Sequence, residues 1–329
     1  MNPSLQSVRA IAALPVLFVF ACGTVAVRVP VMKPAEINMA PYSSVGIGEM
    51  RGNYDRPMAG ALEEALVSSG RFTVVDRAHM DKVMRELQLS STDLADPNSA
   101  AKLGKVVTAG ALIFGDVTHE YREVPSQEHF KDKDGNAHTW NVVKGVFTLH
   151  ANFRITDVST GSLIVAKTYD ETRDDTNRGL DKRPEAINKD ALERAAKASV
   201  VERFMKAIVP HQEFQNAMFR KDSDIPQLEG GIGWAERGDW KKAQDTFNTA
   251  VQDSEKNLKL KSDQIAKAYF DLGLSYEYAG DYAKARSTIE IAFQKSNDRE
   301  MLNELDSIKR LEDDARKLSE QTGGAVGGK

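Results

Sequence analysis

Cysteine is nearly absent from this chain of 329 residues, since Cys22 is the only one. A single cysteine cannot form an internal disulfide, and it excludes a zinc site built from four cysteines. The chain also has no excess of positive charge. It contains 44 lysines and arginines and 48 acidic residues, which gives a formal net charge of −4. Nucleic-acid-binding chains usually carry a basic patch, so the composition gives no support for nucleic acid as a partner.

The first 21 residues have the pattern of a signal peptide. Arg9 precedes an apolar run over residues 10–20, which is too short to cross a bilayer as a helix but has the length of a signal-peptide apolar region. Residues 19–21, Val-Phe-Ala, stand before Cys22 and resemble the lipobox of bacterial lipoproteins. The sequence therefore predicts cleavage before Cys22 and lipidation of its thiol. A plain signal peptide, or an apolar strand with an incidental cysteine, is the alternative.

Lipidation of Cys22 would determine where in the cell the protein is located. Two or more acyl chains on Cys22 would hold the chain stably at a membrane, whereas one chain binds only marginally. Gly23 follows the cysteine and resembles the sorting pattern of outer-membrane lipoproteins. We therefore expect a lipid-anchored protein at the periplasmic face of the outer membrane.

Proline content and hydrophobic periodicity divide the mature chain. Residues 22–42 hold three prolines and no helical periodicity, which predicts an extended tether behind the lipidated cysteine. Residues 43–210 alternate strand-like and helix-like segments and include an alternating hairpin at 145–157 and 162–172, which predicts an α/β domain with a mixed sheet and flanking helices. Residues 226–320 are helical, and 321–329 form a flexible tail.

Apolar side chains at helical spacing indicate the helices of the α/β domain. The sets that carry this spacing are Met58, Leu62 and Leu66; Met80, Val83, Met84 and Leu87; and Leu192, Ala196, Val200, Phe204 and Ala207/Ile208. A further short helix is predicted at residues 98–109.

Residues 226–320 contain an internal repeat, in which residues 231–251 align with 273–293. The matched pairs are Gly231/Gly273, Trp234/Tyr276, Gly238/Gly280, Asp239/Asp281, Trp240/Tyr282, Ala243/Ala285 and Ala250/Ala292. They resemble the tetratricopeptide helix-turn-helix repeat, whose small residues let paired helices approach closely. The period of 42 residues exceeds the about 34 of that repeat, so residues 257–264 are an insertion or a helix extension. Residues 298–320 are predicted to form a capping helix.

A repeat of this kind suggests a face for a protein partner. The face would come from positions on the first helix of each pair, namely Leu228, Ile232, Phe270, Leu274, Glu277 and Tyr278. The alternative is that this face packs against the insertion or another subunit. Trp234 and Tyr276 are better explained as packing residues than as ligand-binding aromatics.

A further pattern runs through residues 70–164. It comprises Gly70–Arg77, Asp81, Lys82, Ala100–Lys105, Gly110, Gly115–Thr118 and the stretch 153–164. This pattern resembles the curli-secretion-channel (CsgG-type) lipoprotein family over about residues 43–209. The resemblance implies a lipid-anchored envelope protein whose periplasmic mixed-sheet domain can assemble into homo-oligomeric rings, and the anchor expected at Cys22 agrees with it.

The best-known member of that family adds two membrane hairpins per subunit to build an export channel, and this sequence departs from it. Residues 119–133 carry charges at both strand parities with Pro125 among them, and residues 170–190 are charged throughout. Charges that face lipid cost about 2–4 kcal/mol each at depth. The sequence therefore predicts no transmembrane barrel but a solvated hairpin over 119–142, with its turn at Asp134 and Gly135.

Motifs for catalysis, metals and cofactors are weak. Residues 46–52 approach a dinucleotide fingerprint through Gly46, Gly48 and Gly52, but the third glycine falls one position late. Residues 132–136 resemble a calcium loop without its required glycine and glutamate positions, so we interpret them as a turn. The six histidines lack metal-ligand spacing. We expect no enzyme activity, cofactor or metal site.

The function expected from the sequence is therefore non-enzymatic. We expect an outer-membrane lipoprotein that scaffolds envelope biogenesis or curli-like surface export, with envelope or secretion proteins as partners of its repeat domain. One alternative is an activator of a cell-wall synthase, and another is a subunit of an oligomeric export channel. A nucleotide-dependent enzyme is a third class, resting on the three glycines alone.

Overall fold

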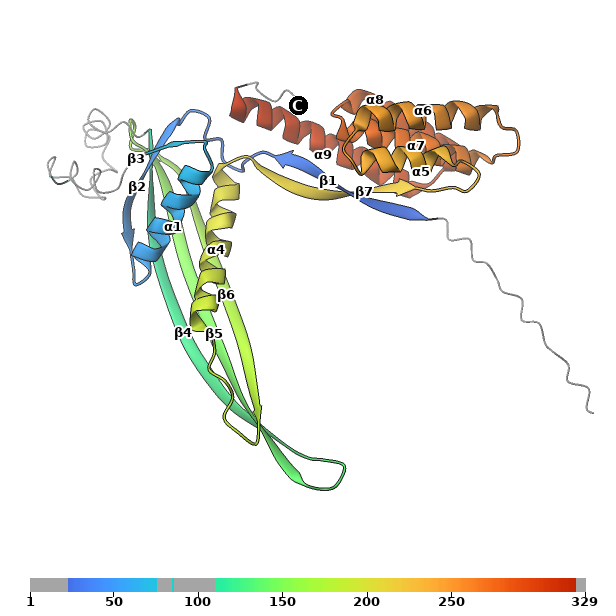
Figure 1. Ribbon diagram of the computed structural model, residues 1–329. Coiled ribbons are helices and arrows are strands. Elements are labelled where there is room, and N and C mark those ends of the chain that lie inside the picture. Colours follow the sequence, from blue (N-terminus) through green and yellow to red (C-terminus); the bar gives the residue numbers. More distant parts are fainter. Residues whose placement is uncertain (1–22, 76–84, 86–109, 324–329) are drawn as a thin grey trace, which may run out of the picture. The chain divides into compact units, whose positions relative to one another are not determined.

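The structure is a computed structural model that describes residues 23–75, 85 and 110–323 (Figure 1). Contacts divide these residues into a sheet unit, residues 32–213 and 313–323, and a helical unit, residues 23–31 and 214–312. The helices predicted around Asp81 and Lys82 and at residues 98–109 lie outside the described residues. So do residues 1–22, with the predicted signal peptide and Cys22, residues Ala100–Lys105, and residues 324–329.

The sheet unit is built on a mixed sheet with the strand order β3-β2-β4-β5-β6. The strands are β2 (Ser44–Arg51), β3 (Thr73–Val75), β4 (Ala111–Lys131), β5 (Ala137–Asp157) and β6 (Leu163–Leu180). Strand β2 runs parallel to β3 and β4, whereas β4, β5 and β6 are antiparallel neighbours. The predicted mixed α/β sheet is confirmed, and the last three strands are longer than their sequence pattern indicated.

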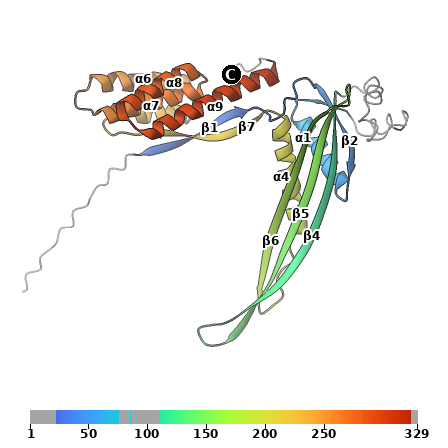
Figure 2. The ribbon, with the colours of Figure 1, turned by 180° about the vertical axis from the view of Figure 1, so that it is seen from behind.

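Two helices, α1 (Asp55–Ser68) and α4 (Lys189–Ile208), cover one face of this sheet, as the opposite views of Figures 1 and 2 show. Their predicted apolar stripes are the buried ones, from Met58 to Leu66 in α1 and from Leu192 to Ile208 in α4. Phe204 packs against Phe153 of β5, with 4.7 Å between the ring centroids. Burial of these stripes supplies most of the driving force that holds the helices on the sheet.

Strand β5 follows the alternation expected of a half-covered sheet. Phe147, Leu149 and Phe153 are buried beneath the helices, whereas His150 and Arg154 point to the other face and are exposed. A shift of one residue would exchange the two sets, so the apolar side chains fix the register of β5 between its neighbours.

The helical unit contains α5 (Gln227–Ala235), α6 (Trp240–Lys256), α7 (Ser262–Tyr278), α8 (Tyr282–Ser296) and the first half of α9 (Arg299–Thr322). The predicted capping helix at 298–320 is therefore present, although its residues from Asp313 onward belong with the sheet unit. A helical region after the α/β unit is confirmed, while its assignment to the tetratricopeptide class stays a prediction. Within the described ranges, no helix is long and apolar enough to cross a bilayer.

The two aligned segments have the same local geometry. Asp239 and Asp281 each cap a helix by accepting a hydrogen bond from the backbone N–H three residues later, at 3.1 and 3.2 Å. Gly238 and Gly280 precede them with φ of +71° and +85°, a region that glycine enters without a steric penalty. The Gly-Asp pair thus ends one helix and begins the next in both segments.

The tether predicted for residues 22–42 is wrong over its first half. Residues Thr24–Lys33 form strand β1, which pairs with β7 (His211–Arg220) in a two-stranded sheet. Val27 and Val29 of β1 are buried in the core of the helical unit. Pro30 is tolerated because its side chain is exposed and because each strand of a two-stranded sheet has one edge that needs no donor.

Candidate functional site

The candidate site lies on the far part of the β4–β5–β6 sheet. The three strands continue well past the ends of α1 and α4 (Figure 2). Strands β4 and β5 stay paired from Ala111↔Asp157 to Lys131↔Ala137, and β6 follows β5 out to Trp140↔Leu180. The hairpin predicted for residues 119–142 is present as the end of this sheet, and its exposure to solvent rather than lipid stays a prediction. We call the part of the sheet beyond Tyr121 the arm.

The turn of the arm is built as the sequence predicted. Gly135 has a φ of +86°, and its N–H donates to the carbonyl of Asp132 at 3.1 Å. The Asp132 carboxylate accepts from the backbone N–H groups of Asp134 and Asn136 at 2.9 and 2.8 Å. Asp132 therefore satisfies the backbone of the turn, the role that aspartate commonly plays at such positions. These contacts occupy the Asp132 carboxylate, the first residue of the stretch that resembled a calcium loop.

The loop at residues 181–188 returns along the arm from β6 to α4, and two asparagine side chains hold it. Asn141 of β5 donates to the carbonyl of Lys182 at 3.1 Å. Asn177 of β6 donates to the carbonyls of Glu185 and Ala186 at 3.2 and 3.0 Å. A loop that lies on a sheet has no ladder partner, so these amides satisfy carbonyls that would otherwise need water.

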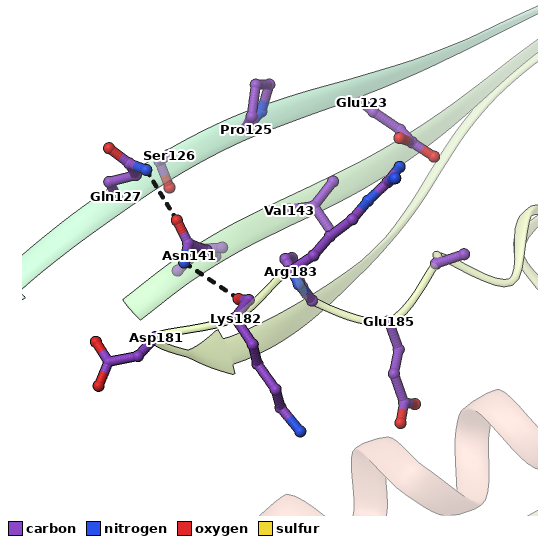
Figure 3. Close-up of a pocket in the computed structure, with 13 residues that line it drawn as sticks. Glu123, Pro125, Ser126, Gln127, Asn141, Val143, Asp181, Lys182, Arg183 and Glu185 are labelled. Carbon is purple, nitrogen blue, oxygen red and sulfur yellow. Dashed lines mark hydrogen bonds between the residues drawn. The ribbon is translucent and has the colours of Figure 1, made fainter. Parts of the chain in front are cut away.

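Between this loop and the strands lies a groove with a volume of about 1240 Å³ (Figure 3). Its walls come from β4, from β5 and from the 181–186 loop. The lining residues are Glu123, Pro125, Ser126, Gln127, Asn141, Val142, Val143, Asp181, Lys182, Arg183, Pro184, Glu185 and Ala186. Gln127 donates to the Asn141 side chain at 2.8 Å, which fixes the amides of the groove floor.

The groove offers three kinds of contact. Lys182 and Arg183 on the loop supply cationic donors, Glu123 and Glu185 supply anionic acceptors, and Val143 with its neighbours supplies apolar surface. A protein chain presents backbone donors and acceptors together with charged and apolar side chains, so this mixture suits a peptide segment better than a single charged ion. Sequence analysis missed the groove because residues 170–190 were interpreted only as a charged stretch.

A histidine ties the turn of the arm to the same loop. His138 Nδ1 lies 2.6 Å from Asp181 Oδ2, and its Nε2 lies 3.2 Å from Asp132 Oδ2. The hydrogen bonds to Asp181 and then to Asp132 raise the pKa of His138. The pKa of Asp132 is lowered to about 2, chiefly by its hydrogen bonds to Asn136. The three side chains therefore form a clamp that is strongest when the histidine is protonated.

Aromatic side chains of the arm stack beside this clamp. The Phe130 ring stacks on His138 and on Trp140, with centroid distances of 5.6 and 6.5 Å. Phe130 is nevertheless 40% exposed. The end of the arm therefore presents an aromatic surface next to charged groups, a composition common at protein interfaces.

The partner-binding face predicted from the repeat is not exposed, and that prediction is wrong. Leu228, Ile232, Phe270, Leu274 and Glu277 are buried, and Tyr278 is half-buried. The strands β1 and β7 contribute Val27, Val29, Ala217 and Phe219 to the same core. Phe219 stacks on Phe247 of α6 at 5.6 Å. The chain therefore uses this surface for its own packing, against β1 and β7, whereas the alternative named the insertion or another subunit.

Glu277, on this buried face, is held by contacts within the protein. Its Oε1 accepts a hydrogen bond from Ser307 of α9 at 3.0 Å. Burial, together with the nearby charge of Glu304, raises the pKa of Glu277 to about 9. Tyr278 beside it stacks on Trp240 at 5.7 Å. Glu277 is therefore protonated at neutral pH and contributes to the contact between α7 and α9.

The glycines of the dinucleotide-like segment have packing roles. A Cβ at Gly48 would lie 2.5 Å from the Phe114 ring, so the glycine makes room for that side chain on β4. Gly52 has a φ of +108° and would place a Cβ 2.0 Å from the Val117 carbonyl oxygen. Gly48 is therefore explained by the close approach of β2 to Phe114, and Gly52 by a tight turn against β4. Among the described residues, no group of three or more histidine, cysteine or acidic side chains has the arrangement of a metal site.

Comparison with known proteins connects the sheet unit to one family. Residues 38–181 match the family model described as "Curli production assembly/transport component CsgG". This range contains the whole five-stranded sheet, the arm included, and ends at the first residue of the 181–188 loop. No curated protein matches the chain.

Several solved structures match part of the chain at low identity. The C-terminal domain of LpoB from Salmonella enterica is 17% identical, with a TM-score of 0.24, and the match covers 40% of this chain and 83% of that chain. Lipoprotein GNA1162 from Neisseria meningitidis is 16% identical, with a TM-score of 0.28 and coverages of 49% and 98%. The PelC dodecamer from Paraburkholderia phytofirmans is 17% identical, with a TM-score of 0.25 and coverages of 56% and 98%. Likeness at this level does not extend to function.

Proposed function

We propose, from the match of residues 38–181 to the CsgG family model, that the chain is a non-enzymatic, lipid-anchored component of envelope assembly or curli-like surface export. The observation that carries the proposal is the family match over the whole sheet and its arm. In this proposal the groove on the arm binds a segment of an envelope or secretion protein. The helical unit adds further surface for protein partners.

The arm is well suited to contact another protein. Its groove combines Lys182 and Arg183 with acceptors and apolar side chains, and its end carries the exposed Phe130. The asparagine contacts to the loop hold the groove in shape before a partner arrives, which lowers the entropy cost of binding.

The partner proposal can be tested by crosslinking in intact envelopes. The double variant Lys182→Glu/Arg183→Glu should lose the proteins that the wild-type chain recovers. A matched control reverses two exposed arginines on helices α1 and α4, Arg56→Glu/Arg194→Glu, and should recover them unchanged. If both variants recover the same partners as the wild type, the groove is not their binding site.

The anchor at Cys22 is the second part of the proposal. It is supported by the apolar run before Ala21 and by the lipobox-like residues. Cys22→Ser should move the protein from the outer-membrane fraction to the soluble periplasmic fraction and abolish incorporation of labelled palmitate. Retention of the variant in the membrane fraction would count against the lipid anchor.

Assembly into a homo-oligomeric ring is the third part. Strand β6 pairs with β5 alone among the described strands, so 18 residues of one strand present an open edge. An edge of this length is a ready site for pairing with another chain. Mass photometry of the purified lipoprotein in detergent should find one closed multimer. A monomer at all concentrations would contradict the ring.

A subunit of an export channel is the second candidate function. Strand length favours it, because β4 and β5 have 21 residues each, more than the about 9–11 that cross a membrane. The charged side chains along the arm favour the scaffold instead. Single-channel recordings in planar bilayers decide between the two, since reproducible unitary conductance would replace the scaffold proposal by the channel.

A further inference from the structure

The turn between α6 and α7 contains most of the insertion that lengthens the repeat. The backbone N–H of Leu260 donates to the carbonyl of Asn257 at 3.1 Å, and the N–H of Lys259 donates to the Asn257 side chain at 3.1 Å. Leu260 packs against the helical core. Leu258, at the apex of the same turn, is 98% exposed. The turn therefore holds one leucine in the core and presents the other entirely to its surroundings.

Positive charge surrounds the exposed leucine. Lys256, Lys259 and Lys261 are all exposed, and no carboxylate pairs with them in the part of the chain that the structure describes. Of the acids that flank this turn in sequence, Glu255 is paired with Lys295 at 2.7 Å, and Asp263 is exposed in the first turn of α7. An apolar side chain flanked by unpaired lysines is the composition of a surface that contacts anionic lipid, because the lysine stems reach along the apolar layer while their ammonium groups meet phosphate.

This turn lies at the end of the helical unit where strand β1 begins. The backbone N–H of Lys221 donates to the carbonyl of Gly23 at 2.8 Å. The next residue, Asp222, accepts from the Gln264 amide at 3.2 Å, and Gln264 in turn accepts from the N–H of Lys261 at 3.1 Å. A short series of hydrogen bonds thus connects Gly23 with the 257–261 turn. Figure 1 shows the start of β1 and the connection between α6 and α7 at the same end of the unit.

We propose that the 257–261 turn is a second membrane contact, which inserts Leu258 among lipid headgroups and binds their phosphates through Lys256, Lys259 and Lys261. The proposal rests on the anchor proposed at Cys22. Only Gly23 separates that cysteine from strand β1, so an acylated Cys22 keeps this end of the helical unit at the bilayer surface. A lipid chain and a basic patch are two membrane signals whose binding strengths combine, so the turn would add to the hold of the anchor.

The first experiment places a fluorophore on the turn of the lipidated protein in vesicles of phosphatidylcholine and phosphatidylglycerol. Acylation blocks the only native thiol, so Leu258→Cys supplies a single site for an environment-sensitive nitrobenzoxadiazole label. Glu236→Cys is the control, since it is exposed at the C-terminal end of α5, in the turn before α6. The length of α6 separates that turn from the 257–261 turn by about 25 Å at 1.5 Å per residue.

The expected result is a blue-shifted emission that brominated lipids quench at position 258 and an aqueous emission at position 236. Aqueous emission at both positions would overturn the proposal while leaving the anchor intact. A shift at 258 that occurs without vesicles and grows with protein concentration would indicate a contact between copies of the chain and would overturn it too.

The second experiment separates the turn from the anchor. The mature Cys22→Ser chain, which carries no lipid, is titrated with the same vesicles. Replacing Lys256, Lys259 and Lys261 by glutamine should weaken binding by about five-fold for each lysine. The control replaces three exposed lysines of the sheet unit, Lys131, Lys133 and Lys182, by glutamine. If the two triple variants bind equally, net charge alone explains binding and the proposal fails, whatever the state of Cys22.

Discussion

Two glycines of helix α5, two positions apart, should respond to alanine with opposite signs. A Cβ at Gly231 would lie 2.3 Å from the Phe247 ring, whereas a Cβ at Gly233 would meet nothing closer than the Arg237 guanidinium at 3.7 Å. The first distance requires the ring to move, and the second is an ordinary contact. Phe247 has little freedom to move, because it is fully buried and stacks on Phe219.

The magnitudes follow from two competing effects. Alanine in place of glycine inside a helix stabilises it by about 1 kcal/mol. Overpacking a core site costs about 1–3 kcal/mol. Gly231→Ala should therefore lower the free energy of unfolding by about 1 kcal/mol net, and Gly233→Ala should raise it by up to about 1 kcal/mol. The repeat-matched Gly273, whose Cβ would lie 2.5 Å from Ile289, should behave like Gly231.

Urea denaturation of the mature chain measures the difference. In a Trp140→Phe background the remaining tryptophans, Trp234 and Trp240, both belong to the helical unit, so their fluorescence reports that unit alone. If Gly231→Ala proves as stabilising as Gly233→Ala, the close approach of α5 and α6 is not what requires the glycine, and the packing account of the repeat is refuted.

Three further predictions concern titration and packing. Because its bond to Asp181 raises the pKa of His138 above 6.5, the clamp should be strongest below that pH and weaken as pH rises through the raised value. Amide exchange of residues 132–138 should then accelerate, and His138→Gln should lose this pH dependence. Burial raises the pKa of Glu277 from 4.5 to about 9, so its contribution to stability should fall by about 1.4 kcal/mol per pH unit between these values. In urea titrations across that window, Glu277→Gln should remove this slope, and an unchanged slope would contradict protonation of Glu277. Phe204→Ala should cost about 3–5 kcal/mol in urea denaturation, and a loss under 1 kcal/mol would argue against its packing on Phe153.

Sequence patterns within single segments predicted much of the fold, but they did not predict which distant segments pair with each other. The stripe from Leu192 to Ile208 identified α4, since helical periodicity is visible within one segment. The turn at Gly135 was predicted because its signal, the Asp134-Gly135 pair, also lies within one segment. Strand β1 escaped prediction because its partner β7 begins at His211, in a stretch to which no element was assigned. Neither β1 nor β7 has a sequence pattern that identifies its partner when the partner is so distant in the chain.

The candidate site was harder to predict than the fold. The groove depends on Asn141 and Asn177, whose amides hold the 181–188 loop against the strands. An asparagine in a strand carries no signal that distinguishes such a contact from an exposed position. The prediction of an exposed partner-binding face was wrong for a related reason. Leu274 and Glu277 have the positions of a repeat's inner face, but their exposure depends on whether other parts of the chain cover that face.

The corrected role of residues 24–33 changes how the anchor can be tested. If they formed a tether, shortening them would bring the domains nearer the membrane and leave both folded. Instead, Val27 and Val29 are buried in the helical core, and burying an aliphatic side chain of this size contributes about 1.5–3 kcal/mol. Removing both, together with the pairing to β7, would take away an amount comparable with the whole stability of a typical domain, about 5–15 kcal/mol. A truncated chain that leaves the membrane fraction would therefore report unfolding as readily as loss of the anchor. Substitution of Cys22 alone avoids this ambiguity, because it leaves every residue of β1 in place.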